Sequence, residues 1–187
     1  MSMPTLNRHW TVADLEDLPD DGNRYEVIDG ELFVTPAPAL LHQAAVGELY
    51  ARLRGFLIRQ AVGVAFVSPA DITFSPTRLV QPDVFVVPIT GGRRPKQWTD
   101  VTQLLLAVEV LSPTTARADR VRKRRLYGEE GVSEYWIVDL EARTFERSTP
   151  SDPRVEVLAE ELTWSPAGAT ESLVMDLSEF FATVLDR

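Results

Sequence analysis

The segment 104–139, LLLAVEVLSPTTARADRVRKRRLYGEEGVSEYWIVD, places the strongest constraint on how this chain folds. Residues 104–111 are apolar except for Glu109, and Ser112-Pro113 follow, which predicts a strand buried on both faces. Residues 114–130 are helical in composition and so rich in charge that one face of the helix must be wet. Residues 134–139 predict a second strand. We therefore expect a strand–turn–helix–strand unit around which the other elements are organised.

Glu109 is unusual because it interrupts this apolar run. Burying a lone carboxylate costs several kcal/mol unless a cation pairs with it or a metal ion is coordinated. The helix that follows carries Lys123, in a chain with 17 Arg and only two Lys. A carboxylate at the end of a core strand and a cation on the adjoining helix are the main clue to function.

Composition limits the classes of protein that remain. The 187 residues predict one domain, 1–187, and a hydrophobic fraction of 44% is ordinary for a globular protein. No apolar run approaches the ~20 residues of a membrane span, and the N-terminus lacks a signal-peptide pattern. The absence of cysteine excludes disulfides and fits a cytoplasmic protein. With two histidines, any metal must be held mainly by oxygen ligands, which favours Mg²⁺ or Mn²⁺.

The order of strand and helix patterns along the chain predicts an α/β or α+β fold, with a mixed central sheet flanked by helices. Residues 1–22 are expected to form a tether with a short helix at 12–18. Hairpin strands are expected at 24–34 around Asp29-Gly30. Further expected elements are a long amphipathic helix at 40–60, strands at 62–66, 71–74 and 80–87, a closing antiparallel pair at 144–147 and 155–158, and a last strand and helix within 171–185.

Asp83 is the second acid placed beside a long apolar strand. If its strand neighbours that of Glu109, the two carboxylates converge at one end of the sheet. Two carboxylates with water and phosphate oxygens make a typical magnesium site, and Glu26 is a candidate for a third ligand. Lys123 would add a cation for the attacking water or the developing phosphate charge. This set predicts metal-assisted phosphodiester hydrolysis.

Each candidate also has a structural interpretation. Asp83 could cap a turn or pair with an arginine, and Lys123 could form a surface ion pair with Asp119, four residues earlier. His42 could position water or be a satisfied, half-buried histidine, and Tyr127 is more often packing than chemistry. Arg117, Arg120 and Arg124 share a helix face that is either solvated or a phosphate track, although a net charge of −9 argues against a general nucleic-acid coat protein. Trp136 and the strand EYWIV predict core or dimer contacts.

Several motifs together resemble the Uma-two family. They are YEVIDGEL, the helix containing His42, QPDVFVV, VEVLSPTTARADRVRK, Tyr127 and GVSEYWIVD, in matching order from about residue 24 to 147. The resemblance implies a PD-(D/E)XK, restriction-endonuclease-like fold, a magnesium-dependent endonuclease site and a homodimer. Pro82-Asp83 matches the PD element and Glu109 the acidic element. The motif lysine would fall at Leu111, so Lys123 takes its place from the helix.

Two functions follow from different classes. The first is a magnesium-dependent endonuclease acting on DNA, with Asp83 and Glu109 as metal ligands, Lys123 and Glu26 as further catalytic residues, and His42 and Tyr127 as accessory residues. The alternative is a catalytically inactive nuclease-like fold that binds nucleic acid or protein. A purely structural buried salt bridge between Glu109 and Lys123 also stays open.

Overall fold

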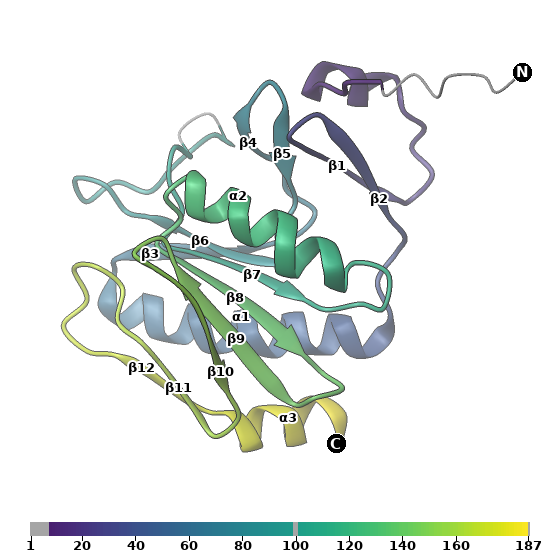
Figure 1. The fold of residues 1–187 in the computed structure, drawn as a ribbon. Helices are drawn as coiled ribbons and strands as arrows, with labels where there is room; N and C mark the ends of the chain where they lie inside the picture. The colour runs from purple at the N-terminus through teal and green to yellow at the C-terminus, as the bar shows by residue number, and fades with distance from the viewer. Residues whose placement is uncertain (1–7, 99–100, 187) are drawn as a thin grey trace, which may run out of the picture.

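A six-stranded mixed sheet forms the centre of the molecule (Figure 1). It is seen in a computed structural model that describes residues 8–98 and 101–186. Its strands, in spatial order, are β10 (Asp152–Leu158), β9 (Thr144–Thr149), β8 (Glu134–Asp139), β7 (Leu106–Val110), β6 (Val84–Pro88) and β3 (Gly63–Val67). β7 and β8 are parallel and the other pairs are antiparallel. The expected mixed sheet with flanking helices is confirmed.

The strand–helix–strand unit expected at 104–139 supplies the parallel pair. Every residue of β7 is buried, as the apolar run predicts. The connecting helix is not regular, because η3 (Ala118–Lys123) is π-helical and only α2 (Arg124–Glu129) returns to α geometry. Both edges of β8 are paired within the chain, so the EYWIV strand cannot be shared with a second chain and its Trp136 belongs to the core.

Helices cover both faces of this sheet (Figure 1). The long helix α1 (Leu40–Gln60) packs on one face, and η3 with α2 lies on the other. Alternate residues of each strand face opposite ways. Val84, Val108 and Trp136 belong to the core on the α1 side, whereas Phe85 and Ala107 belong to the core beneath α2. The same alternation turns the side chains of Asp83 and Glu109 toward η3.

A second, antiparallel sheet has the order β2 (Glu31–Thr35), β1 (Arg24–Ile28), β5 (Arg78–Val80), β4 (Ile72–Ser75). Asp29 and Gly30 have φ of 51° and 79°, which are the positive values that the expected hairpin turn requires. The continuous strand expected at 80–87 is wrong. Pro82 separates β5 from β6, because proline has no N–H to give to a ladder. The break carries the chain between the sheets and leaves Asp83 at the start of β6.

The C-terminal elements complete the core on the α1 side. The antiparallel strands β11 (Glu161–Trp164) and β12 (Leu173–Asp176) lead into α3 (Leu177–Leu185), as expected for the strand and helix, although β11 had no clear signal in the sequence. At the other end, η1 (Val12–Asp17) is held to the second sheet by backbone hydrogen bonds from Trp10 to Gly30 and from Val12 to Pro76. No helix in the described part of the chain has the length and apolar character needed to cross a membrane.

Candidate active site

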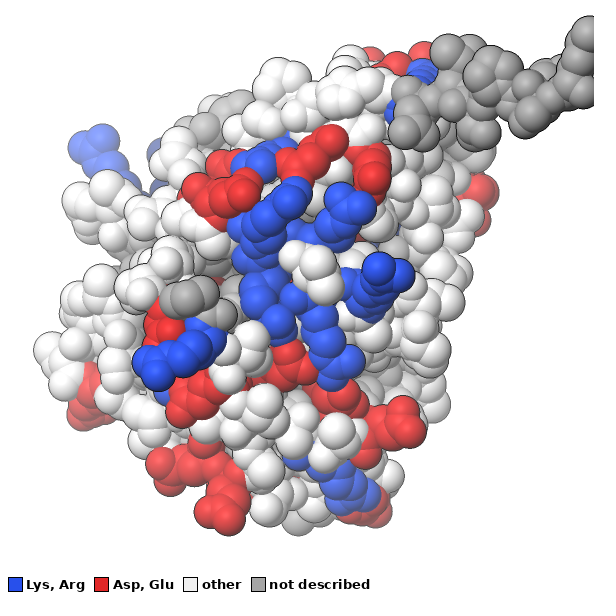
Figure 2. Space-filling view, in the orientation of Figure 1, with Lys and Arg blue, Asp and Glu red and all other residues white. Residues whose placement is uncertain are grey.

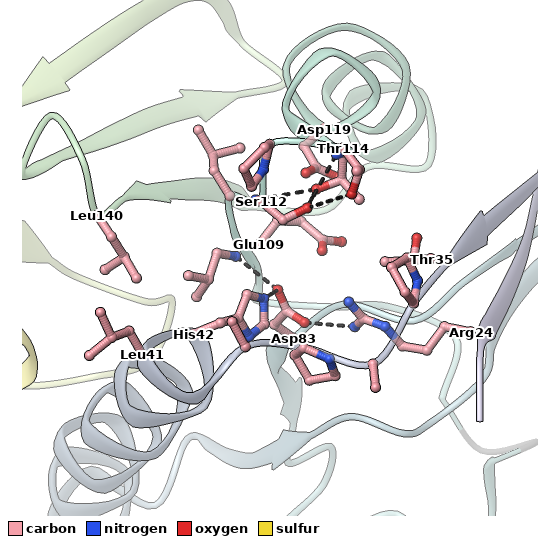
Figure 3. A pocket seen from close by; sticks show the side chains of 18 of the residues that line it. Arg24, Thr35, Leu41, His42, Asp83, Glu109, Ser112, Thr114, Asp119 and Leu140 are labelled. Atoms are coloured by element: carbon pink, nitrogen blue, oxygen red, sulfur yellow. Dashed lines mark hydrogen bonds and ion pairs between the residues drawn. The ribbon is translucent and has the colours of Figure 1, made fainter.

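A cavity of about 300 Å³ lies where the start of β6, the end of β7, the N-terminus of α1 and η3 meet (Figure 3). Six ionisable side chains line it: Arg24, His42, Asp83, Glu109, Asp119 and Lys123. They come from both sheets and from helices on both faces of the central sheet. Five of them are nearly inaccessible to solvent, with exposed fractions between 1% and 6%. The cavity therefore has a floor of buried, ionisable side chains.

Asp83 is held by hydrogen bonds to both carboxylate oxygens (Figure 3). Oδ1 accepts a hydrogen bond from Nη1 of Arg24 at 2.7 Å. Oδ2 lies 3.0 Å from Nε2 of His42 and accepts a hydrogen bond from the backbone N–H of Val110 at 2.9 Å. Burial raises the pKa of Asp83, but the hydrogen bond from His42 and the charges of His42 and Arg24 outweigh burial and lower the pKa below its usual value. Asp83 is therefore ionised.

Lys123 lies at the centre of the remaining acids. Its Nζ is 2.9 Å from Oε1 of Glu109, 2.9 Å from Oε1 of Glu26 and 3.6 Å from Oδ1 of Asp119. Burial lowers the pKa of Lys123, but the three carboxylates overcome burial and raise it, so the ammonium stays charged. Tyr127 donates its hydroxyl hydrogen to Oε1 of Glu109 at 3.1 Å. The ammonium is therefore fixed in position and can donate hydrogen bonds.

Asp119 and Lys123 both lie in η3, which is π-helical, and both are buried. The N–H of Arg124 reaches the carbonyl of Asp119, five residues earlier. Because such a turn holds more than four residues, side chains four apart lie almost above one another. Both therefore point to the cavity, whereas Val121 between them is 58% exposed. Oδ1 of Asp119 is buried and has no hydrogen-bond partner.

The buried groups carry an excess of negative charge. Four carboxylates, of Glu26, Asp83, Glu109 and Asp119, face the two cations of Arg24 and Lys123, which leaves two negative charges uncompensated when His42 is neutral. Burial raises the pKa of Glu109 well above its usual value; Lys123 opposes this, and the three other acids add to it. Burial likewise raises the pKa of Asp119. In the metal-free protein, protons must compensate part of this charge.

The arginines of η3 and α2 form a separate basic strip on the surface, bordered by acids (Figure 2). Arg120 pairs with Asp139 at 2.8 Å and with Glu146 at 2.6 Å, and Arg124 also pairs with Glu146. Arg122 pairs with Glu31 at 3.1 Å. These ion pairs attach the helix to the two sheets. They also neutralise much of the positive charge of the strip.

The sequence matches the family model Uma2, described as "Putative restriction endonuclease", over residues 12–182. The chain belongs to the Uma2 family. A crystal structure of "a putative nuclease belonging to DUF820" from Anabaena variabilis ATCC 29413 superposes with a TM-score of 0.76 at 20% identity, covering 94% of this chain and 99% of that chain. At that identity the likeness establishes the fold alone. No curated protein matches the sequence. Membership of Uma2 supports a nuclease function, contact with nucleic acid and use of a divalent metal ion.

Four of the residues expected in this Uma2 site line the cavity, namely His42, Asp83, Glu109 and Lys123. Glu26 and Tyr127 are not lining residues, since they lie behind Lys123 and Glu109 and hold them by the contacts given above. Their catalytic or accessory roles stay predictions.

The structure adds contacts and lining residues that the sequence did not predict. His42 lines the cavity and is bound to Asp83. Leu111, at the place of the motif lysine, also lines it. Two ionisable lining residues were not among the expected site residues: Arg24, and Asp119, which the sequence suggested only as a surface partner of Lys123. The spacing of Asp119 from Lys123 was the available signal, because residues four apart share one face of a helix.

The Uma2 cavity offers oxygen donors of the kind that Mg²⁺ and Mn²⁺ prefer. Within the described part of the chain, no three His, Asp or Glu side chains are grouped so as to hold a metal ion by themselves. Magnesium is usually bound by one or two carboxylates and keeps several waters, so a full protein cage is not required. The uncompensated charge and Oδ1 of Asp119, which accepts no hydrogen bond, therefore fit a hard divalent cation.

Proposed function

We propose that this protein is a nuclease that hydrolyses DNA phosphodiester bonds with a magnesium or manganese ion held by Asp83 and Glu109. The observation that carries the proposal is the excess of buried carboxylates over cations in and behind the cavity, which a divalent cation would compensate. Family membership supports the same chemistry. A bound divalent ion would lower the pKa of water and stabilise negative charge on the phosphoryl group.

Lys123 serves this reaction as a fixed hydrogen-bond donor. Because its pKa is raised, its ammonium stays protonated and cannot act as the base. It can donate to a phosphate oxygen or to the attacking water, where developing negative charge strengthens the hydrogen bond. Glu26 supports it, since it accepts from Lys123 at 2.9 Å and also from the backbone N–H of Gln81 at 2.7 Å.

His42 is the cavity's candidate proton acceptor. An ionised carboxylate only accepts hydrogen bonds, so Nε2 of His42 must carry the proton directed at Asp83. In the neutral ring, Nδ1 then holds the lone pair, and this atom is buried without a hydrogen-bond partner. Asp83 fixes the tautomer and orientation of the ring, and Arg24 fixes Asp83. His42 therefore has a free acceptor atom for a proton from the attacking water, once Nδ1 becomes accessible to that water.

The test is cleavage of supercoiled plasmid and of labelled oligonucleotides by purified protein in Mg²⁺, in Mn²⁺ and in EDTA. We expect cleavage with either ion, none in EDTA, and a loss of at least about 10²-fold in Asp83→Asn and Glu109→Gln. Glu160→Gln is the matched control, because Glu160 is an exposed acid outside the cavity. If the folded wild-type protein cleaves no single-stranded, branched or duplex DNA, the proposal is refuted.

A catalytically inactive binding module is the second candidate. The contacts of Asp83 favour this candidate. Both of its carboxylate oxygens already accept hydrogen bonds, so a metal ion would have to compete with Arg24 and His42. This candidate predicts that Mg²⁺ does not bind at the acids. Calorimetric titration of the wild type with Mg²⁺, compared with Asp83→Asn and Glu109→Gln, distinguishes the two candidates.

The homodimer implied by the family resemblance is also a proposal. Because both edges of β8 are paired, such a dimer must use another surface. Light scattering should give twice the chain mass of 20.9 kDa if the dimer forms, and the single-chain mass if it does not.

A further inference from the structure

Most of the uncharged lining of the cavity is apolar, although Thr and Ser side chains also contribute to it. Six lining residues form what we call the collar: Pro36, Pro38, Leu41, Leu111, Pro113 and Leu140. Pro36 and Pro38 come from the segment joining β2 to α1, and Leu41 lies in the first turn of α1. Leu41 is 48% exposed, and its neighbour Leu40 is 85% exposed. Figure 3 shows Leu41 and Leu140 on the same side of the cavity as His42. Something apolar in the substrate is needed to use this surface.

The collar has no cation to offer to a nucleic-acid backbone. Among the described residues that line the cavity, the cationic ones are Arg24 and Lys123. Both are paired with carboxylates at 2.7 to 2.9 Å. Proteins that follow the backbone of a duplex contact phosphates with many Lys and Arg. The collar therefore suits the face of a base better than a run of phosphates.

The depth of the acids adds a steric argument. Asp83 and Glu109 are each 2% exposed, at the bottom of a cavity of about 300 Å³. This volume lies at the small end of the range for small-molecule pockets, about 300–1,000 Å³. A B-form duplex, whose major groove alone is about 12 Å wide, cannot enter such a space intact. A phosphate reaches the acids more easily if its nucleotide leaves the stack.

We propose that the collar receives one unstacked nucleotide, and hence that the preferred substrate is DNA with unpaired nucleotides, such as a gap, a flap or a single strand. This inference rests on the proposed nuclease function. Apolar side chains of DNA-distorting proteins likewise insert beside unstacked bases. Extruding a base is least costly where the base is unpaired, so unpaired DNA is cleaved faster than duplex.

The first test compares kcat/KM for three oligonucleotides of one sequence: a continuous duplex, the duplex with a three-nucleotide gap, and the single strand. We expect the gapped and single-stranded DNA to be cleaved at least tenfold faster than the duplex. Leu41→Gln should reduce cleavage of the gapped DNA about five- to tenfold. Ile58→Gln is the control, because Ile58 is 59% exposed on the same helix but about 25 Å along it.

The second test does not depend on cleavage. A 2-aminopurine placed in the gap is titrated with wild-type protein in Ca²⁺, and gel analysis verifies that the DNA stays whole. We expect its fluorescence to change on binding, and the change to be lost in Leu41→Gln but kept in Ile58→Gln. Equal cleavage of duplex and gapped DNA, or an unchanged signal with the wild type, overturns this inference and leaves the nuclease proposal standing. Failure to cleave any DNA overturns both.

Discussion

The replacement Glu109→Gln distinguishes a metal site from a structural ion pair. Glutamine keeps the shape of the side chain and an acceptor oxygen for Lys123 and Tyr127, but it removes one buried negative charge. Lys123 retains Glu26 at 2.9 Å and Asp119 at 3.6 Å. The uncompensated charge of the cluster falls from two to one. Without metal, we therefore expect the variant to be as stable as the wild type or more stable.

The magnitude follows from what each replacement leaves behind. Exchanging a charged hydrogen-bond acceptor for a neutral one costs about 1 kcal/mol, and relief of repulsion between acids offsets it. Lys123→Met instead leaves three buried carboxylates without their central cation, which should lower the free energy of unfolding by about 3–5 kcal/mol. The difference between the two variants is the expected signature of a site with too few cations.

The pH dependence has a definite sign. The pKa of Glu109 is raised in the folded protein, so the folded state binds the more protons above the ordinary pKa of 4.5. The free energy of unfolding of the wild type therefore falls as the pH rises from 4.5 toward the pKa that Glu109 has in the folded protein. Glu109→Gln has no carboxyl group at this position and does not lose stability in this way. The advantage of Glu109→Gln in EDTA should grow from pH 5 to pH 8.

The assay is urea unfolding of the wild type and both variants, in EDTA and in Mg²⁺. At a Mg²⁺ concentration of 100 times Kd, the wild type should gain about 2.7 kcal/mol, and Glu109→Gln should gain much less. A loss of about 3 kcal/mol or more for Glu109→Gln in EDTA, similar to that of Lys123→Met, would refute the reasoning. It would show that Glu109 and Lys123 are simply a structural pair.

Three further predictions concern other parts of the molecule. The affinity for Mg²⁺ should fall up to about tenfold per pH unit below the pKa of Glu109, with proton release measurable by calorimetry in two buffers; an affinity independent of pH contradicts this. His42→Gln should slow cleavage by about 10²-fold and should leave Mg²⁺ affinity within about twofold; unchanged kinetics would exclude the histidine as base. Trp164→Ala should lower the free energy of unfolding by about 3–5 kcal/mol in urea titrations, because Trp164 is 1% exposed and packs on Phe56 and Trp136, with Trp164→Phe as the milder control.

Much of the fold was predictable because several patterns are strong over long stretches. The helix at 40–60 has the bounds of α1, since its apolar residues recur at helical spacing without interruption. The Asp29-Gly30 turn fixed the first hairpin, and the apolar run before Ser112 marked the central strand. Asp83 and Glu109 could be expected at one end of the sheet because each interrupts an apolar strand. Their cavity confirms that they lie together.

What the sequence did not reveal depends on backbone geometry rather than on residue type. Residues 80–87 are continuously strand-like in composition apart from Pro82, yet this proline sends the chain from one sheet to the other. The π turn has no residue signature of its own, so a regular helix was expected, and a surface ion pair of Asp119 with Lys123 was one of the open interpretations. Arg24 reaches Asp83 across 59 residues of sequence, a contact that no local pattern contains.

The position of Lys123 has a consequence for how this chemistry can vary. A lysine on the strand two residues after Glu109 would move rigidly with the acid. Here the ammonium is carried by the helix η3, which packs on the sheet. The contacts of Arg120 and Arg124 with Glu146 help to fix the position of this helix. Substitutions on the outer side of the helix could therefore displace the cation while the two strand acids stay where they are. Activity in such a protein could be weakened, tuned or lost from a distance, without any change inside the cavity.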